Sequence, residues 1–400
     1  MGSIIRKIVV RITPVLWLVD IPRLRKNNKK ITDRAGIEKA SGRVALVRLD
    51  AIGDFIIWLD SAAEFRKQFN DRTLVLVCNK ACEGIAKASG LFDEIVPVDT
   101  GKLNYAGNFK FRKQLVEELN RISVEILIQT AFTRRVYTDV VVSAIAAAKK
   151  VTIRDTSFDN AARWALDRTD AIYDEVIDTN ESGHEDMMEI LRNARFTRLV
   201  TGSTFKSSVP VLKASPIREE LILQGDYFVV FPGGSFKAKM WPMDRFAEAA
   251  QYIHDKTGWK CCVCGAPNEK YLAKALIENY KGDVIDMTGK TNLIESIEII
   301  RNARFLIGND TSGIHFAAAT GTKALCVFGG WHYGRFLPYD VEDDKGRPLP
   351  AVCVKNMQCF NCHIINKSKE CQSHMRQTGL FTCVDEVSVE QVKEALDRIL

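Results

Sequence analysis

Three short polar motifs, each at the end of an apolar run, carry side chains that could do chemistry. The first is RLDAIGD at 48–54, where Gly53 permits a tight turn and Asp54 falls in the first turn of an expected helix. Asp54 would then lie at the C-terminal edge of the expected sheet, where α/β proteins bind ligands. A carboxylate there can cap the helix, which is our default interpretation, or act as a general base that takes a proton from a bound hydroxyl.

The second motif is a glycine turn followed by lysines. Residues 231–235 read FPGGS, and Lys237, Lys239 and a Trp-Pro pair follow. A glycine turn after a strand lets backbone N–H groups approach phosphate oxygens, and lysines add positive charge. Because Gly-Gly turns are common, the motif indicates an anion site only together with its neighbours.

The third motif is GNDTSGIH at 308–315, between an expected strand and a helix of small residues. A strand, a polar glycine turn and a helix N-terminus together form an anion site. Asp310 would repel a phosphate, so we expect it to accept hydrogen bonds from sugar hydroxyls or to be the helix N-cap. His315 is either a ligand contact or a packed side chain of the first helical turn.

Two series of alternating strands and helices position these motifs. Strands of the first series are expected at 44–49, 74–78, 95–98, 126–129 and 151–153. Its helices are expected at 54–69, 81–89, 109–121 and 137–148. The second series begins with a strand at 227–232 and ends with a strand at 323–328. This alternation predicts an α/β fold with two doubly wound parallel sheets.

Length and composition agree with two globular cores. The chain has 400 residues, 46% hydrophobic and 26% charged, which suits two domains of ordinary composition. A polar stretch followed by Pro210 and Pro216 indicates the boundary. We expect an N-terminal arm at 1–40, a first Rossmann-like domain at 41–208, a linker at 209–222, a second such domain at 223–385 and a final helix at 386–400.

The net charge of +6 fits an anionic partner without selecting one. In the arm, apolar residues alternate with basic ones, and the longest uncharged stretch, 12–19, is too short to span a membrane. The arm is an interfacial anchor on anionic lipid, a helix packed on the protein's own surface or a disordered leader. Without an evident secretory signal, we expect a reducing cytoplasmic location.

Ten of the eleven cysteines fall into two groups. The first group lies in apolar runs and is expected to be buried: Cys78, Cys261, Cys262, Cys264 and Cys326. The second group lies near the C-terminus and includes a CxxC pair: Cys353, Cys359, Cys362, Cys371 and Cys383. Such a cluster could hold a structural zinc ion, form a disulfide or remain as free thiols.

The motifs and their order resemble glycosyltransferase family 9, the lipopolysaccharide heptosyltransferases. The matching stretches are VRLDAIGD at 47–54, PGGS at 232–235 with Lys239 and WP at 241–242, and the long run 286–329. The resemblance covers about residues 42–400. It implies a GT-B type fold, in which two Rossmann-like domains face a cleft, and an inverting, metal-independent sugar transfer that requires no cofactor.

The resemblance also assigns roles to residues. Asp54 would be the base, Lys239 would hold the leaving diphosphate, Asp310 would bind the donor sugar, and Glu269 would reach the ribose. The remaining donor contacts would be Gly233, Gly234, Ser235, Thr311, Ser312, Gly313 and His315. The family default is an ADP-heptose donor and a lipopolysaccharide inner-core or glycolipid acceptor, on the inner face of the cytoplasmic membrane. No nucleic-acid partner is expected.

The chain departs from the family after Phe328. The family usually has Gly-Pro-Thr-Asp there, whereas this sequence reads GGWHYGRF at 329–336. Trp331 or His332 could stack on a base or sugar, and Arg335 could bind phosphate. The altered loop therefore leaves the identity of the donor sugar undetermined.

Arg134 and Arg135 are either surface residues or contacts to acidic groups of the acceptor. A nucleotide-sugar epimerase with a GT-B fold and a non-catalytic sugar-binding protein are the alternatives. The first lacks its expected additional carboxylates, and the retained Asp54, Lys239 and Asp310 argue against the second.

Overall fold

The computed structural model describes residues 42–104, 108–154, 167, 169–180, 187–362 and 368–400. The N-terminal arm therefore lies outside the described residues. The chain forms two compact units. Most of the first half belongs to unit 1, and Lys206–Leu400 form most of unit 2, together with Ile56–Asp60 and a short piece that ends at Leu191.

Unit 1 is built on a six-stranded parallel sheet in the order β3-β2-β1-β4-β5-β6. The strands are β1 (Arg43–Arg48), β2 (Thr73–Asn79), β3 (Glu94–Val98), β4 (Ser123–Gln129), β5 (Ala146–Ile153) and β6 (Glu175–Ile177). Its helices are α2 (Ile52–Gln68), α3 (Glu83–Ser89), α4 (Thr100–Asn104), α5 (Phe109–Leu119), α6 (Val136–Ala144) and α8 (Glu189–Thr201). This is the Rossmann strand order, whose switch point lies between β1 and β4.

Unit 2 repeats the topology with a sheet in the order β12-β11-β10-β7-β8-β9. The strands are β7 (Tyr227–Phe231), β8 (Lys260–Val263), β9 (Val284–Asp286), β10 (Phe305–Asn309), β11 (Ala324–Phe328) and β12 (Ala351–Val354). The main helices are α9 (Met243–Thr257), α10 (Lys270–Asn279), α11 (Leu293–Arg301), α12 (Ser312–Thr320), α13 (Lys369–Thr378), α14 (Thr382–Asp385) and α15 (Val389–Asp397). Here the switch point lies between β7 and β10.

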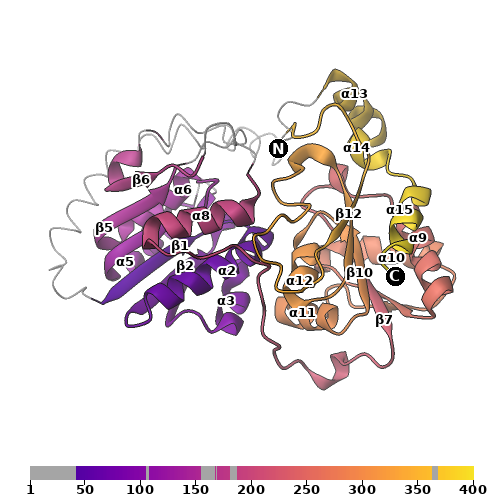
Figure 1. Ribbon diagram of the computed structural model, residues 1–400, viewed down its shortest axis with the longest axis horizontal. Coiled ribbons are helices and arrows are strands. Elements are labelled where there is room, and N and C mark those ends of the chain that lie inside the picture. Colours follow the sequence, from indigo (N-terminus) through magenta and orange to yellow (C-terminus); the bar gives the residue numbers. More distant parts are fainter. Residues whose placement is uncertain (1–41, 105–107, 155–166, 168, 181–186, 363–367) are drawn as a thin grey trace. The chain divides into compact units, whose positions relative to one another are not determined.

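Each sheet is covered on both faces, as near-continuous apolar strands require. In unit 2, α9, α10 and α15 pack over one face, and α11 and α12 lie on the other (Figure 1). In unit 1, side chains of α5 and α6 share a core with β1 and β2. The expected α/β fold with two doubly wound parallel sheets is confirmed, and the five cysteines expected in apolar runs are buried.

Some expected elements were wrong. Residues 146–148 belong to β5 rather than to the preceding helix, because Ala146 and Ala147 pair with Ser123 and Val124 of β4. Sheet pairing here overrides the helix preference of alanine. The short edge strands β6 and β12 were not expected. No helix among the described ranges is long and apolar enough to cross a membrane.

Candidate nucleotide-sugar site

The second and third sequence motifs meet at the switch point of unit 2. Phe231 at the end of β7 stands in register with Gly308 of β10. A Cβ atom on Gly308 would lie 2.7 Å from the carbonyl oxygen of Phe231, and one on Gly313 would lie 2.6 Å from its ring. Only glycine fits at these two close approaches. The loops after β7 and β10 are therefore locked side by side.

Asn309 joins the two loops through both ends of its amide. Its Nδ2 donates to the carbonyl of Pro232 at 2.6 Å, and its Oδ1 accepts from the main-chain N–H of Trp241 at 2.9 Å. The side chain is fully buried. Sequence reasoning gave Asn309 no role, although a polar amide at the end of a buried apolar strand was a signal that it must bridge neighbouring backbone groups.

Lys239 and Asp310 form the charged centre of the site. Lys239 lies in the short helix η5 (Lys237–Lys239), and its Nζ donates to the main-chain carbonyl of Asp310 at 3.0 Å. Burial raises the pKa of the Asp310 carboxyl. The charges of Lys239 and His332 and a side-chain hydrogen bond from Trp331 oppose this rise. A buried carboxyl group and a partly buried ammonium group thus lie close together at this turn.

Helix α12 begins directly after Asp310. Its N-cap is Thr311, without a side-chain capping bond, so the expectation that Asp310 is the N-cap was wrong. Thr311 and Ser312 are partly exposed, and Gly313 is buried against Phe231. The first N–H groups of a helix have no intrahelical partner and bear partial positive charge. The start of α12 can therefore receive an anion beside Lys239.

His315 is buried in the same helix. Its Nδ1 is 2.7 Å from the hydroxyl of Tyr339, and the two rings stack with centroids 5.8 Å apart. Burial, helped by the charge of Lys239, lowers the pKa of His315 to about 4. The imidazole is therefore neutral near pH 7, and its described partner is Tyr339.

Glu269 lies across the glycine turn of the second motif. A Cβ atom on Gly233 would be 2.2 Å from Glu269 Oε1, so a larger residue there would require this carboxylate to move. Glu269 Oε2 also accepts from the N–H of Ala266 at 2.7 Å. Gly234 packs near Met240, and Ser235 is exposed. The structure thus gathers Gly233 and Glu269, which are distant in sequence.

In the loop 329–336, two of the three residues predicted to contact the ligand are buried. Trp331 is 2% exposed and packs against Phe328 and Phe381. Lys239 Nζ lies 5.8 Å from the centroid of the Trp331 ring. Arg335 is buried, with its Nε 3.5 Å from a carboxylate oxygen of Glu189.

Trp331 is therefore a buried neighbour of Asp310 and Lys239 and does not present its ring to solvent. His332 is partly exposed and contributes charge near Asp310.

The first motif occupies the switch point of unit 1. Helix α2 has Ala51 as its N-cap without a side-chain capping bond, and Asp54 is the acidic residue of its first turn. Asp54 is partly exposed. Asp54 therefore lies in the first helical turn, as expected, where its charge suits the helix N-terminus, and the N-cap position is occupied by Ala51.

Arg48 is the residue that fixes this turn, and sequence reasoning gave it no role. Its guanidinium is fully buried at the end of β1, pairs with Asp50 at 2.7 Å and donates to the main-chain carbonyl of Asp54 at 3.2 Å. It also donates to the carbonyl of Thr130 and to the side chain of Asn193. A lone arginine inside an apolar strand was the available signal.

Arg134 and Arg135 have different surroundings. Arg134 is 1% exposed, pairs with Asp139 and Asp170 and lies over the Tyr173 ring. The side chain is thus an interior group of unit 1 rather than a surface cation. Arg135 is exposed and precedes α6 as its N-cap residue.

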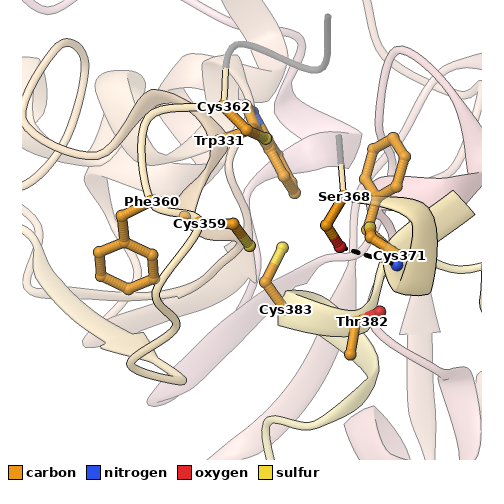
Figure 2. Close-up of a pocket in the computed structure, with 10 residues that line it drawn as sticks. Trp331, Cys359, Phe360, Cys362, Ser368, Cys371, Thr382 and Cys383 are labelled. Atoms are coloured by element: carbon orange, nitrogen blue, oxygen red, sulfur yellow. Dashed lines mark hydrogen bonds between the residues drawn. The ribbon is translucent and has the colours of Figure 1, made fainter. Parts of the chain in front are cut away.

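Four of the five C-terminal cysteines lie together in the structure, and the fifth lies apart from them. Four of them line one small pocket together with Trp331, Phe360 and Phe381: Cys359, Cys362, Cys371 and Cys383 (Figure 2). Cys353 does not line this pocket and lies in β12, in register with Val327. All five are free thiols. Among the residues that the structure describes, no three His, Cys, Asp or Glu side chains already stand close enough to hold a metal ion.

Thiols crowd together in this pocket. Burial raises the pKa of the Cys383 thiol to about 12. A hydrogen bond from the main chain of Gly330 opposes the rise, and the nearby thiols of Cys371, Cys362 and Cys359 add to it.

Two parallel sheets in Rossmann order, with helices on both faces of each, define a GT-B type α/β protein. Residues 165–362 match the model of glycosyltransferase family 9 (heptosyltransferase). This match confirms the resemblance seen in the sequence. The match includes the loops after β7 and β10 that form the site.

A curated relative supports this assignment. Lipooligosaccharide heptosyltransferase 2 of Haemophilus influenzae is 29% identical over 103 residues, which cover 24% of this chain and 30% of the relative. The chain thus matches less than a third of that relative's length.

Solved structures share the fold at low sequence identity. A glycosyl transferase family 9 protein from Veillonella parvula superimposes with a TM-score of 0.66 at 16% identity, covering 89% of this chain and 96% of the other. E. coli heptosyltransferase WaaC with ADP-2-deoxy-2-fluoro heptose gives 0.63 at 16% identity, covering 89% and 99%. The iron-containing dodecameric glycosyltransferase TibC from enterotoxigenic E. coli H10407 gives 0.52 at 13% identity, covering 88% and 77%.

Proposed function

We propose that this chain is an inverting glycosyltransferase that moves a sugar from a nucleoside-diphosphate sugar to a hydroxyl of a glycolipid. ADP-heptose is the donor that the family suggests, and a lipopolysaccharide inner-core glycan is the acceptor. The observation that carries the proposal is the pairing of Lys239 with the Asp310 turn at the unit 2 switch point. It joins a cation, helix N–H groups and a carboxylate, the set that a sugar diphosphate requires.

The two ends of such a donor fit different parts of this set. The diphosphate would lie against Lys239, Ser235 and the N–H groups of Thr311–Gly313, because these are positive or donate hydrogen bonds. The sugar would lie against Asp310, whose carboxylate accepts hydrogen bonds from hydroxyl groups. Glu269, beside Gly233, would accept from the ribose.

The reaction would proceed by one displacement. The acceptor oxygen attacks the anomeric carbon, a C–O bond forms, and the bond from that carbon to the diphosphate oxygen breaks. Asp54 takes the hydroxyl proton as general base. The nucleoside diphosphate leaves with the electron pair, and Lys239 with the α12 N-terminus stabilises its charge. Attack opposite to the leaving group inverts the anomeric configuration.

The acceptor side rests on fewer observations. Asp54 lies at the switch point of unit 1, and Arg135 is an exposed cation at the start of α6. Arg135 could bind carboxylates or phosphates of an inner-core glycan. The protein would act on the inner face of the cytoplasmic membrane, where the basic N-terminal arm would bind anionic lipid.

Two experiments test the proposal, the first on donor binding and the second on sugar transfer. A thermal-shift screen compares ADP-, GDP- and UDP-sugars, because a ligand present well above its Kd stabilises the fold by mass action. We expect ADP-heptose to give the largest shift. Incubation with that donor and a purified inner-core acceptor should then release ADP and extend the acceptor by one sugar, as detected by mass spectrometry. Stabilisation without transfer to any glycan acceptor would favour a sugar-binding protein instead.

A further inference from the structure

The start of helix α5 (Figure 1) carries the most exposed large apolar side chain of the described residues, Phe109, which is 70% exposed. The same helix already buries an apolar face, since Leu115 and Leu119 lie in the core of unit 1 and Phe111 packs against it. Phe109 does not belong to that face, because helix residues two apart do not lie on the same side. Packing of α5 onto the sheet therefore does not account for an aromatic ring in solvent.

Basic side chains surround Phe109. Lys110 is its neighbour in the chain, and Lys113 lies one turn along the same side of the helix, with its side chain 79% exposed. Lys102 of α4 is exposed as well, and its carbonyl accepts from Asn108 Nδ2 at 3.0 Å, which joins it to the start of α5. We call the set of Lys102, Phe109, Lys110 and Lys113 the Phe109 surface.

The stability of α5 does not explain its lysines. Positive charge is unfavourable near a helix N-terminus, and the first turn of α5 contains no acidic residue. Lys102 pairs with Asp99 at 3.4 Å and Lys113 pairs with Glu117 at 3.9 Å, but exposed pairs of this kind contribute little. Both ammonium groups can therefore exchange these partners for the anionic groups of a ligand.

The topology of unit 1 places the Phe109 surface at the edge that carries Asp54. Helix α4 begins at Thr100, directly after β3 ends at Val98, and α5 then leads back to the start of β4. Because parallel strands all end at one edge of their sheet, the starts of α2, α4 and α6 lie at that edge. Asp54 is in the first turn of α2, and Arg135 directly precedes α6. This is the edge at which we propose that the acceptor binds.

We propose that the Phe109 surface binds an anionic lipid bilayer. The proposal rests on the proposed function, because a glycolipid acceptor is held in a bilayer. The Phe109 ring would enter the boundary between headgroups and acyl chains, and the three lysines would contact lipid phosphates. The bilayer would then present the acceptor headgroup at the edge of unit 1 that carries Asp54.

A bilayer fits this surface better than a protein partner does. The cores of protein interfaces are depleted in charged residues, whereas one aromatic ring among three cations forms no apolar core. An aromatic ring beside lysines is instead the pattern that binds the surface of an anionic membrane. This contact would be separate from any contact made by the N-terminal arm, and stable attachment to a membrane generally requires two such contacts.

Sedimentation of the full-length protein with vesicles tests the proposal. One set of vesicles contains equal parts of phosphatidylglycerol and phosphatidylcholine, and the other contains phosphatidylcholine alone. We expect the wild type to bind the anionic vesicles more tightly. Lys113→Glu should lower the partition coefficient about fivefold or more, the effect of losing one lysine near an anionic surface. Phe109→Ser should lower it about tenfold, because burial of an aromatic side chain contributes at least that much.

Helix α10 of unit 2 offers matched controls. Lys274 is 79% exposed and pairs with Glu278 at 3.7 Å, almost the same arrangement as Lys113 with Glu117. Ile277 is an exposed apolar residue of the same helix. Lys274→Glu and Lys113→Glu change the net charge equally, so a general effect of charge would lower both partition coefficients alike. We expect Lys274→Glu and Ile277→Ser to bind the vesicles as the wild type does.

Hydrogen exchange locates the contact without any substitution. Addition of anionic vesicles to the wild type should slow exchange over 109–116 in α5 and leave exchange over 270–279 in α10 unchanged. This measurement also decides the question if a variant of α5 fails to fold.

Several results would overturn the proposal. The wild type could fail to bind anionic vesicles or bind both kinds equally, and Lys113→Glu and Lys274→Glu could bind alike. Bound protein could also show no slower exchange over 109–116, which would assign the membrane contact to another segment. The vesicles contain no glycolipid and no measurement uses sugar transfer, so failure of this proposal is distinct from failure of the proposed function.

Discussion

The ammonium of Lys239 bonds to the main chain of Asp310 and not to its carboxylate. Nζ donates to the carbonyl oxygen at 3.0 Å, although the two side chains are close enough for the lysine charge to lower the pKa of the carboxyl. The lysine is thus held by the main chain of the turn, while the buried carboxyl group has a side-chain hydrogen bond from Trp331. We base on these separate contacts the prediction that Lys239 binds phosphate and Asp310 binds the sugar.

Lys239→Met should weaken binding of any diphosphate-bearing nucleotide. A charge-assisted hydrogen bond contributes about 1.5–3 kcal/mol, so Kd for ADP should rise about 10- to 100-fold. Isothermal titration calorimetry measures the change. Lys237→Met is the control, since this exposed lysine of the same short helix lies over the Tyr271 ring. Similar Kd values for the two variants would remove Lys239 from the diphosphate site.

Asp310→Asn should weaken binding of the sugar part of the donor more than binding of the nucleotide part. The amide keeps the shape of the side chain but replaces one acceptor with a donor, so hydrogen bonds from sugar hydroxyls are lost. We expect a larger rise in Kd for ADP-heptose than for ADP, measured on the same protein. Because burial raises the pKa of this carboxyl, the substitution should not lower the free energy of unfolding. If the two ligands weaken equally, the assignment of Asp310 to the sugar is wrong.

Asp54→Asn should abolish transfer while leaving donor binding intact. A positioned general base contributes about 10²- to 10⁴-fold to rate, and the amide cannot accept a proton at neutral pH. Initial rates of ADP release in the presence of acceptor measure the loss, and calorimetry with ADP checks donor binding. Asp99→Asn, which removes an exposed carboxylate paired with Lys102, provides the matched control. Unchanged turnover in Asp54→Asn would rule out the base.

The fold was predictable because its signal is distributed over many residues. Val44–Val47 are fully buried in β1, and an apolar run of that kind between helical patterns requires a covered parallel strand. The glycine motifs were predictable for the same physical reason, since Gly308 and Gly313 stand where a Cβ atom would collide with Phe231. Local pattern and tertiary contact agree at these positions.

The positioning residues could not be derived in the same way. Arg48 and Asn309 act through partners distant in sequence, such as Asn193 for Arg48 and Pro232 for Asn309. The orientation of Trp331 depends on its contact with Phe381, which is distant in the sequence. Long-range contacts decide these roles, and periodicity does not report them. The catalytic and donor roles assigned from the resemblance stay predictions.

Arg48→Met should destabilise unit 1 strongly. Removing one partner of a buried, hydrogen-bonded ion pair costs about 3–5 kcal/mol, because Asp50 and the carbonyls of Thr130 and Asp54 lose their donor. Arg43→Met is the control from the same strand, since its pair with Glu94 is exposed and contributes at most about 1 kcal/mol. Urea unfolding followed by circular dichroism compares them. Equal midpoints would show that Arg48 does not stabilise the turn.

His315 should make the stability of unit 2 depend on pH. Its folded pKa of about 4 lies below the ordinary value of 6.5, because burial excludes the charged ring. Between those values the unfolded chain binds a proton that the folded chain does not. The free energy of unfolding should therefore fall as pH decreases from 6.5 to 4, by up to about 3 kcal/mol from this residue.

The substitution His315→Gln isolates this contribution. Glutamine does not titrate, so the variant should lose less stability than the wild type over the same pH range, whatever its stability at pH 7. Other titrating groups act in both proteins and cancel in the difference. Urea unfolding at intervals from pH 7 to pH 4 gives both curves. Parallel curves would mean that the imidazole can be protonated in the folded protein, and that His315 is accessible to solvent or to an anionic ligand rather than closed against Tyr339.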